Sequence, residues 1–288
     1  MKKHLISSFI CLCTFASGLH ASLTIPNNAQ KIECQIQPVA VTPQGPNIQK
    51  SPPGTPPGRN TLPHSPTKFS TSSNWSGYAA ATSLSNPSSK SVTNVSGFWT
   101  IPRLSPSANN AYTAIWVGID GYKSSTVEQI GTLQNWISGA QQNFAFFEMY
   151  PQGAFIIVGF PTNVGDLMGA EVSYVGNNTF QLLLLNATHS LYTIIPFSYT
   201  VSKTALRNSS EWIVEAPSLN NTVLPLANYG SVTFSNCFAT INGTTGSINN
   251  SHWKNDPITM TNSKGQPKSV PSNLGFGGTM FSTIWKNQ

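Results

Sequence analysis

Residues 209–217 carry the sequence Ser-Ser-Glu-Trp-Ile-Val-Glu-Ala-Pro, and this stretch decides the fold class. Its aromatic and β-branched residues, followed by a proline, predict a single β-strand. Side chains alternate between the two faces of a strand, so Glu211, Ile213 and Glu215 share one face. The chain has only nine Asp and Glu residues. Two carboxylates on one strand face therefore predict a functional surface rather than an ordinary solvated one.

Runs of the same texture, separated by Gly, Asn, Ser and Pro, continue on both sides of this stretch. We expect strands over residues 75–81, 92–101, 111–119, 127–130, 144–150, 155–160, 171–175, 179–186, 192–201, 232–234 and 281–285. No stretch combines helical periodicity with helix caps. Residues 72–288 are therefore predicted to form one all-β domain, a β-sandwich of two packed antiparallel sheets.

The N-terminus predicts export from the cytoplasm. Lys2 and Lys3 precede the apolar run 5–16, and a small-residue end follows at Ala21. This is the layout of a secretory signal peptide over residues 1–21, and its apolar run is too short to span a bilayer permanently. We therefore expect a secreted protein, extracellular or periplasmic, with no membrane anchor in its mature form.

Residues 22–71 are rich in Pro, Gln, Ser and Gly, with runs such as Pro-Pro-Gly-Thr-Pro-Pro-Gly at residues 52–58. Such a segment has few apolar residues to bury and too many prolines to pair as strands. Its composition fits a flexible linker and a removable pro-segment equally well.

Cysteine content and charge exclude several classes of protein. Cys34 and Cys237 are the only cysteines outside the predicted signal peptide, so a disulfide framework and a cysteine-rich zinc site are excluded. Whether these two cysteines pair stays open. The formal net charge of +6 includes Lys2 and Lys3, and the other basic residues are scattered. We expect no nucleic-acid partner and no cofactor.

The histidines argue against two common hydrolase mechanisms. Beyond the Pro-rich segment only His189 and His252 remain, each in a polar, turn-like stretch. The sequence has no Gly-x-Ser-x-Gly, so a Ser-His-Asp triad is poorly supported. His-Glu-x-x-His and Cys/His clusters are absent as well, so we expect no catalytic metal. Carboxylates and amides remain as the reactive groups.

Three further strand-like stretches place acids or an amide beside aromatic residues. Taken singly, each could be a sandwich strand with one polar outer face. Taken together with residues 209–217, they predict a groove lined by aromatic and acidic side chains. The side chains concerned are Trp116 with Asp120, Gln129, and Phe146 with Glu148 and Tyr150.

Six ordered motifs lead to a family. They are Asn-Trp-Ser-Gly-Tyr (74–78), Val-Ser-Gly-Phe-Trp-Thr-Ile-Pro (95–102), Trp-Val-Gly-Ile-Asp-Gly (116–121), Gln-Ile-Gly-Thr (129–132), Phe-Glu-Met-Tyr-Pro (147–151) and Glu-Trp-Ile-Val-Glu (211–215). In this order the chain resembles the glutamic peptidases, also called eqolisins or peptidase family G1, as a secreted member of bacterial type. The resemblance implies a sandwich of two curved, seven-stranded antiparallel sheets of the concanavalin A-like lectin and glucanase type, with a cleft on the concave face. It also implies that residues 22–71 are a removable pro-segment.

By this resemblance Gln129 and Glu215 form the catalytic pair. A carboxylate can take a proton from water and later return it to the leaving amine, while an amide N–H can stabilise the developing oxyanion. The resemblance also implies that the cleft is lined or supported by neighbouring acids and aromatic residues. These residues are Trp116, Asp120, Phe146, Glu148, Tyr150 and Glu211.

The resulting hypothesis is a monomeric, secreted acid endopeptidase that acts on polypeptides and is insensitive to pepstatin. Glu128 departs from the family pattern, because an aliphatic residue is expected there, on the strand face opposite Gln129. If that face is the core, Glu128 needs a hydrogen-bond partner or a raised pKa.

Two alternatives from other classes stay open. The first is a glycoside hydrolase that uses two of Glu148, Glu211 and Glu215 as acid and nucleophile. The second is a carbohydrate-binding module without catalysis. Gln129 discriminates between the two enzymes, because a glycosidase has no need of an amide there, whereas a peptidase that attacks with water needs an oxyanion donor.

Overall fold

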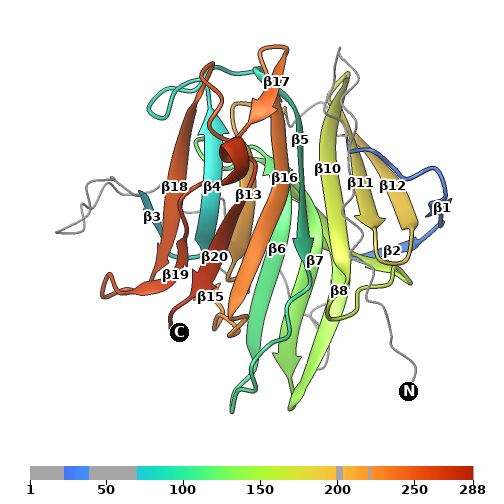
Figure 1. Ribbon diagram of the computed structural model, residues 1–288, viewed down its shortest axis with the longest axis vertical. Helices are drawn as coiled ribbons and strands as arrows, with labels where there is room; N and C mark the ends of the chain where they lie inside the picture. Colours follow the sequence, from blue (N-terminus) through green and yellow to red (C-terminus); the bar gives the residue numbers. More distant parts are fainter. Residues whose placement is uncertain (1–22, 39–69, 199–203, 220–221, 288) are drawn as a thin grey trace, which may run out of the picture.

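A computed structural model gives the fold, and it confirms the all-β prediction (Figure 1). The described part of the chain contains twenty strands and one short 3-10 helix, η1 (Phe276–Gly278). The predicted signal peptide and much of the Pro-rich segment lie outside the described residues, which are 23–38, 70–198, 204–219 and 222–287.

Two layers of strands face each other across a common core (Figure 1). The first layer, sheet A, runs in the order β3 (Ser70–Ser72), β18 (Lys254–Thr261), β4 (Trp75–Ala81), β13 (Ser210–Glu215), β6 (Ala111–Ile119), β7 (Val127–Ile137), β8 (Ala140–Tyr150), β9 (Ala154–Val158) and β2 (Gln35–Pro38). The second layer, sheet B, runs in the order β19 (Pro267–Pro271), β20 (Phe281–Trp285), β16 (Ser231–Ile241), β5 (Val92–Thr100), β10 (Leu167–Gly176), β11 (Thr179–Asn186), β12 (Leu191–Ser198) and β1 (Gln30–Lys31).

The two layers differ in detail from the predicted pair of separate antiparallel sheets. β19 pairs with both β18 and β20, so hydrogen bonding continues from one layer into the other at that side. Two short pairings, β1 with β12 and β3 with β18, are parallel. Smaller elements complete the fold: β17 (Thr244–Ser247) forms a hairpin with β16, and β14 (Ser218–Leu219) pairs with β15 (Thr222–Val223).

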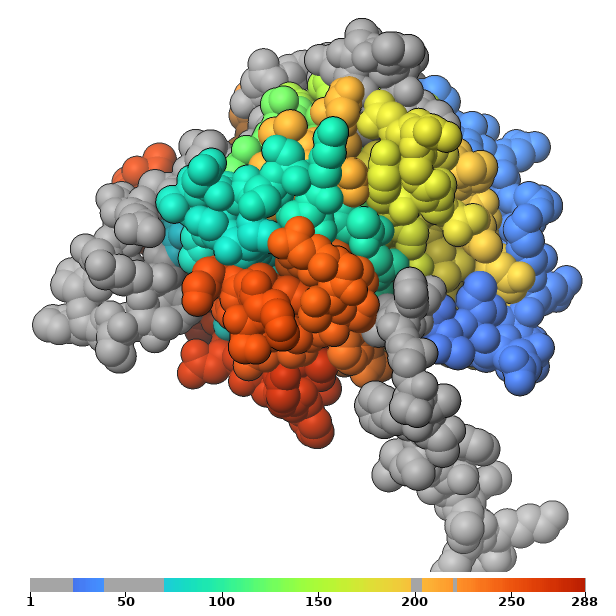
Figure 2. All heavy atoms as spheres, turned by 90° about the horizontal axis from the view of Figure 1, so that it is seen from above, coloured from blue at the N-terminus to red at the C-terminus, as the bar shows by residue number. Residues whose placement is uncertain are grey.

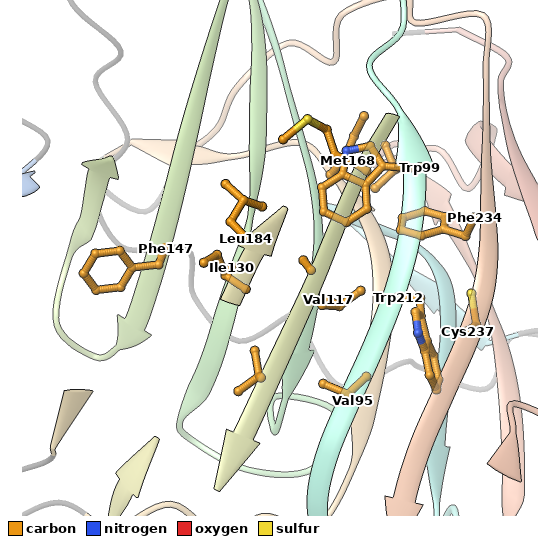
Figure 3. Packing of buried hydrophobic residues seen from close by; sticks show 14 of the residues in the cluster. Val95, Trp99, Val117, Ile130, Phe147, Met168, Leu184, Trp212, Phe234 and Cys237 are labelled. Atoms are coloured by element: carbon orange, nitrogen blue, oxygen red, sulfur yellow. The ribbon is translucent and has the colours of Figure 1, made fainter. Parts of the chain in front are cut away.

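The main core fills the space between the layers (Figure 3). Two buried tryptophans cross it and bond to the opposite layer. Trp212 of β13 donates its indole N–H to the backbone oxygen of Ser96 on β5 at 2.8 Å. Trp99 of β5 donates in the other direction, to Oγ1 of Thr132 on β7 at 2.9 Å. A buried indole needs a hydrogen-bond acceptor, so these two bonds fix how the layers are aligned.

All of the expected strands are present in the described residues, although several ends differ and residues 199–201, at the end of the strand expected over 192–201, lie outside them. β7 and β16 continue well beyond the predicted residues 127–130 and 232–234. The missed strands have the composition of turns: β17 reads Thr-Thr-Gly-Ser, β18 begins Lys-Asn-Asp-Pro, and β19 begins and ends with proline. Their pairing is set by neighbouring strands, which local composition does not reveal.

The N-terminal residues 23–38 also form strands. β1 and β2 pair with β12 and β9, so the expectation that prolines would prevent strand pairing was wrong for these residues. The reason is local, because residues 27–37 contain no proline. Cys34 in this segment and Cys237 in β16 are both free thiols, which answers the open question of a disulfide.

None of the helical structure in the described residues is long and apolar enough to cross a membrane.

Candidate active site

β13, the strand that carries Glu211 and Glu215, lies in sheet A between β4 and β6. Its Trp212 and Val214 enter the main core, as the alternation predicted. Ile213 belongs to a second apolar cluster on the opposite face of the same sheet, together with Trp116 and Phe146. The predicted site residues Glu211 and Glu215 share this face, so we call it the site face of sheet A.

Strand register places four residues in one row across the site face. Glu211 pairs with Gly118 on β6, Gly118 pairs with Gln129 on β7, and Gln129 pairs with Glu148 on β8. Two strand spacings put the Cα atoms of Glu211 and Gln129 about 10 Å apart. The sheet therefore brings together an amide and two acids from three different strands.

Glu215 lies in another row. Glu215 pairs with Ala114 on β6. It follows Glu211 by four residues on β13, a separation of roughly 13 Å along the strand. Its side chain is 1% exposed and accepts two hydrogen bonds. Asn74 Nδ2 donates to Oε1 at 3.1 Å, and Trp116 Nε1 donates to Oε2 at 2.9 Å. Donors to both oxygens favour the ionised carboxylate.

Asn74, which donates a hydrogen bond to Glu215, is a site residue that the sequence did not predict. Ser72 Oγ donates to Asn74 Oδ1 at 3.1 Å, which turns the amide Nδ2 toward Glu215. The asparagine lies just before β4, and its backbone oxygen accepts a hydrogen bond from Ala216 N. The motif Asn-Trp-Ser-Gly-Tyr at residues 74–78 was the available signal, but nothing local in it indicates a contact with a residue 141 positions later.

Trp116 fills the space between Glu215 and the row that contains Gln129. A Cβ atom at Gly118 would lie 2.9 Å from Cζ3 of this indole, and one at Gly131 would lie 2.7 Å from Trp116 Cβ. A side chain at Gly118 would thus meet the ring itself, whereas one at Gly131 would also clash with the backbone oxygen of Ile115 on the paired strand. The indole N–H reaches Glu215 while the opposite edge of the ring reaches Gly118, so a single side chain links the two rows.

Gln129 is fully buried and is held by one of the predicted supporting acids. Its Nε2 donates to Glu148 Oε2 at 3.0 Å. Its Oε1 has no hydrogen-bond partner. A buried amide oxygen without a partner is costly, and such groups occur where a ligand or a reacting group will supply the missing bond.

Asp120 connects the ends of two strands and lies close enough to Glu211 for its charge to act on that residue. It follows β6 directly, and its carboxylate accepts backbone N–H bonds from Arg207 at 2.6 Å and Asn208 at 2.9 Å, and an O–H bond from Thr126 at 3.2 Å. Burial raises the pKa of Asp120, while these hydrogen bonds moderate the rise. Asp120 therefore ties the end of β6 to the segment that leads into β13.

Glu211 is buried without the donors that surround Glu215. Neither of its carboxyl oxygens has a hydrogen-bond partner of normal geometry. Burial raises the pKa of Glu211 well above its ordinary value, and the nearby charge of Asp120 acts in the same direction. Ser209 and the backbone N–H of Tyr122 oppose this shift. The two glutamates of β13 thus lie in different environments, because burial raises the pKa of Glu211 whereas Glu215 accepts hydrogen bonds on both of its oxygens.

This burial predicts a pH dependence of stability. Because the folded-state pKa of Glu211 lies above that of the unfolded chain, the folded protein binds more protons, and the free energy of unfolding falls as pH rises from about 4.3 toward the folded pKa. One such group contributes a slope of up to about 1.4 kcal/mol per pH unit. We expect Glu211→Gln to flatten this slope in urea unfolding between pH 4 and 7.

The control for this prediction is Glu33→Gln, since the Glu33 side chain is 84% exposed. We expect it to leave the pH profile of stability unchanged. A Glu211→Gln profile as steep as the native one would show that Glu211 is not the group responsible.

The predicted aromatic lining is present on the same face. Phe146 is buried and pairs with Gly131 and Ile156, and Tyr150 packs at the edge of this cluster while partly exposed. Trp75 meets Trp116 edge to face, with ring centroids 5.0 Å apart.

Glu128 lies on the other face of β7, as the alternation predicted. It is fully buried and pairs with Ile119 and Met149, both of which are residues of the main core. It is therefore a core acid and stands apart from the row that contains Gln129.

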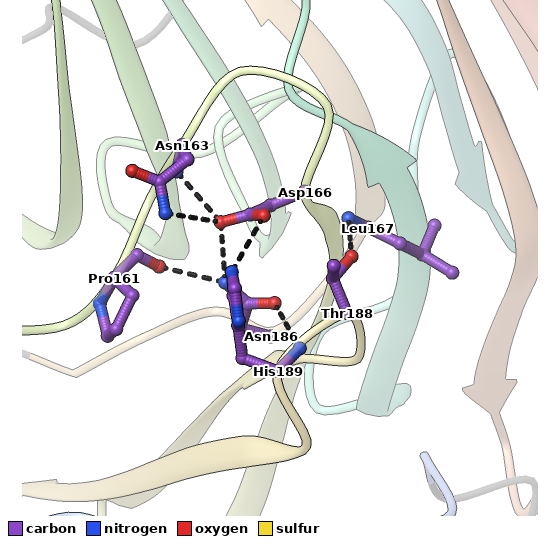
Figure 4. Close-up of polar contacts among 7 residues, drawn as sticks. All are labelled: Pro161, Asn163, Asp166, Leu167, Asn186, Thr188 and His189. Atoms are coloured by element: carbon purple, nitrogen blue, oxygen red, sulfur yellow. Dashed lines mark hydrogen bonds and ion pairs between the residues drawn. The ribbon is translucent and has the colours of Figure 1, made fainter.

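The histidines are placed elsewhere in the fold. His189 Nε2 lies 3.1 Å from Asp166 Oδ1, in a polar cluster that joins the segment before β10 to the turn after β11 (Figure 4). The same aspartate accepts bonds from Asn163 and Asn186. His252 is exposed and contacts Asn250. Within the described contacts neither histidine meets a serine hydroxyl, so they supply no triad.

Within the described residues, no three His, Cys, Asp or Glu side chains are grouped so that they could hold a metal ion.

Comparison with known proteins places the chain in a family. The family model described as the Peptidase A4 family matches residues 73–271, a range that contains every predicted site residue. The chain belongs to the Peptidase A4 family. This match confirms the resemblance to the glutamic peptidases.

Relatives of this Peptidase A4 chain agree with that assignment. Aspergillopepsin-2 of Aspergillus niger is 29% identical over 150 residues, which is 52% of each protein, so the chain spans about half the length of this relative. Scytalido-glutamic peptidase, solved with a transition-state analogue inhibitor, superposes with a TM-score of 0.63 at 23% identity, covering 74% of this chain and 98% of that one. Aspergilloglutamic peptidase from Aspergillus niger superposes with a TM-score of 0.54 at 23% identity, covering 61% of this chain and 99% of that one. The β-sandwich fold is thus shared.

Proposed function

We propose that this Peptidase A4 chain is a secreted acid endopeptidase, in which Glu215 acts as general base and acid and Gln129 stabilises the oxyanion. The observation that carries the proposal is the contrast between the two glutamates of β13. Glu215 accepts hydrogen bonds on both oxygens, whereas Glu211 has no partner of normal geometry and a raised pKa. Pairs of acids in such different environments are typical of acid–base catalysis.

The chemistry assigns one step to each group. The Glu215 carboxylate removes a proton from water as the water attacks the peptide carbonyl, and the protonated Glu215 then gives the proton to the leaving nitrogen. Gln129 has a free oxygen and an Nε2 that bonds to Glu148, so its amide is already oriented before substrate binds. An oriented N–H donor stabilises the charge that develops on the carbonyl oxygen.

Acidic working conditions follow from this scheme. The same carboxyl group must be ionised for the first step and protonated for the second, so activity is expected near the pKa of a carboxylic acid. Burial raises the pKa of both Glu211 and Asp120, and this fits a site that works at low pH.

Access to the site requires a change in the full-length chain. Gln129 is fully buried, Glu215 is 1% exposed, and the Trp116 indole lies between them, so a peptide bond cannot reach both side chains in this state. We expect activity to develop after incubation at low pH, when the predicted pro-segment is processed. A lag in the progress curve would be the kinetic sign of this step.

The test of the function is direct. The purified chain is incubated with an unfolded protein at pH 2 to 7, with and without pepstatin, and with a β-glucan in a parallel series. We expect new peptide termini at acidic pH in both pepstatin arms and no release of sugar. Release of reducing sugar without peptide cleavage would instead favour the glycoside hydrolase alternative, and intact substrates in both series would favour a binding module.

A further inference from the structure

Residues 23–38 bind to both layers of the sandwich. After a turn at residues 26–29, β1 pairs with β12 of sheet B. Further along the segment, β2 pairs with β9 of sheet A. Figure 2 shows this segment, in blue, lying against the flank of the molecule beside the strands of residues 167–198. One short segment therefore contacts the outermost strand of each layer.

This arrangement closes the open side of the sandwich. On the opposite side, β19 already carries hydrogen bonding from one layer to the other. On this side β9 and β12 would end their layers with unpaired backbone N–H and C=O groups. Such edges pair readily with other chains and lead to aggregation. The segment covers both edges, with bonds such as Gln30 N to Ser190 O and Ile32 N to Tyr192 O, both 2.8 Å.

The side chains of residues 31–34 alternate between the core and the solvent, as they do in a strand that belongs to a sheet. Ile32 and Cys34 pack against the main core, while Lys31 and Glu33 point outward and form an ion pair at 2.7 Å. Two apolar side chains inserted between the layers contribute burial in addition to the backbone bonds.

The start of the segment has a separate anchor on the outer face of sheet B. Leu23 is only 7% exposed and packs with Leu183 and Leu185. Its backbone N–H donates to Glu171 Oε2 at 2.5 Å, and Ser173 donates to the other oxygen of this buried acid. Cleavage after Ala21 would make Ser22 the first residue, so the α-ammonium group would stand one residue before Leu23, whose N–H bonds to this carboxylate.

We propose that residues 23–38 are not discarded with the pro-segment but form a bound strand of the mature protein. A break in the chain between residues 39 and 69 separates them covalently from the catalytic domain and leaves them attached through β9, β12 and Glu171. The segment lies outside residues 73–271, which match the family model. Strand addition to a sheet edge, with side chains entering pockets, holds peptides without a covalent link.

The test uses the full chain with the recognition sequence of a site-specific protease inserted after Gly54. After cleavage at neutral pH, gel filtration at micromolar concentration followed by mass spectrometry reports whether the N-terminal fragment elutes with the domain. We expect one peak that contains both pieces, which requires a Kd well below the working concentration. A fragment that elutes separately overturns the proposal.

A matched pair of variants tests the seating of the strand. Ile32→Asp places a charge against the core and should weaken retention roughly a hundredfold. Ile36→Asp makes the same change at a position that is 44% exposed and should leave the fragment bound. If both variants lose the N-terminal fragment to the same extent, the proposal is contradicted.

Hydrogen exchange on the intact, uncut chain gives a readout that does not depend on cleavage. The amides of Gln30 and Ile32 should be protected to the same degree as those of β12. Exchange at these two amides at the rate of an unfolded chain would show that the strand is not seated. None of these measurements uses peptidase activity, so their outcome is independent of the proposed function.

Discussion

Glu215→Gln should lower kcat by about a thousandfold or more, with little change in the binding of an unfolded protein substrate. Gln has the same shape as Glu but cannot take a proton from water, and positioned acid–base groups contribute roughly a hundredfold to ten-thousandfold to the rate. The substitution also places an amide NH2 against one of two donors, Asn74 Nδ2 or Trp116 Nε1. Circular dichroism and thermal unfolding must therefore accompany the initial rates, measured at acidic pH.

Glu128→Gln is the matched control for that variant. Glu128 is equally buried in sheet A, but it faces the main core. We expect its kcat to stay within a few-fold of the native value. The contradicting result is also specific: activity that survives Glu215→Gln but disappears in Glu211→Gln would make Glu211 the base, because Glu211 is the acid that shares a row with Gln129.

The site could be predicted in part from local patterns. Alternation along residues 209–217 put Glu211 and Glu215 on one face and Trp212 on the other, which the structure shows to be the core face. Alternation also put Gln129 and Glu128 on opposite faces of β7. These statements need only the period of two that every strand has. They say nothing about which residues of different strands are neighbours.

Register supplied what the sequence could not. The row from Glu211 through Gly118 to Gln129 and Glu148 depends on three strand pairings, and a shift of one pairing by two residues would change every neighbour. The contact of Asn74 with Glu215 depends on β4 lying beside β13, which are distant in sequence. Sequence motifs indicated that these segments matter, but not that they touch.

The fold shows the same division. Strands rich in apolar residues, such as β6 and β11, were predicted with their observed ends. β1 and β2 consist mainly of polar residues, so composition indicated a linker. They are strands because β9 and β12 offer unpaired edges beside them, and edge pairing depends on backbone groups more than on side-chain type.

Gln129→Ala should lower kcat/KM by about a hundredfold to a thousandfold, the usual cost of losing one oxyanion donor. The amide makes its bond to Glu148 before substrate arrives, so its removal leaves a cavity and frees that carboxylate, but it does not disturb Glu215. The loss should therefore appear in kcat and be similar at every acidic pH, whereas loss of the base would change the shape of the pH profile. Gln134→Ala is the control, because Gln134 is an equally buried amide on β7 that faces the other side of the sheet and has no hydrogen-bond partner. Equal losses of kcat/KM in the two variants would mean that truncating β7 side chains harms the fold, and Gln129 would then have no claim to the oxyanion.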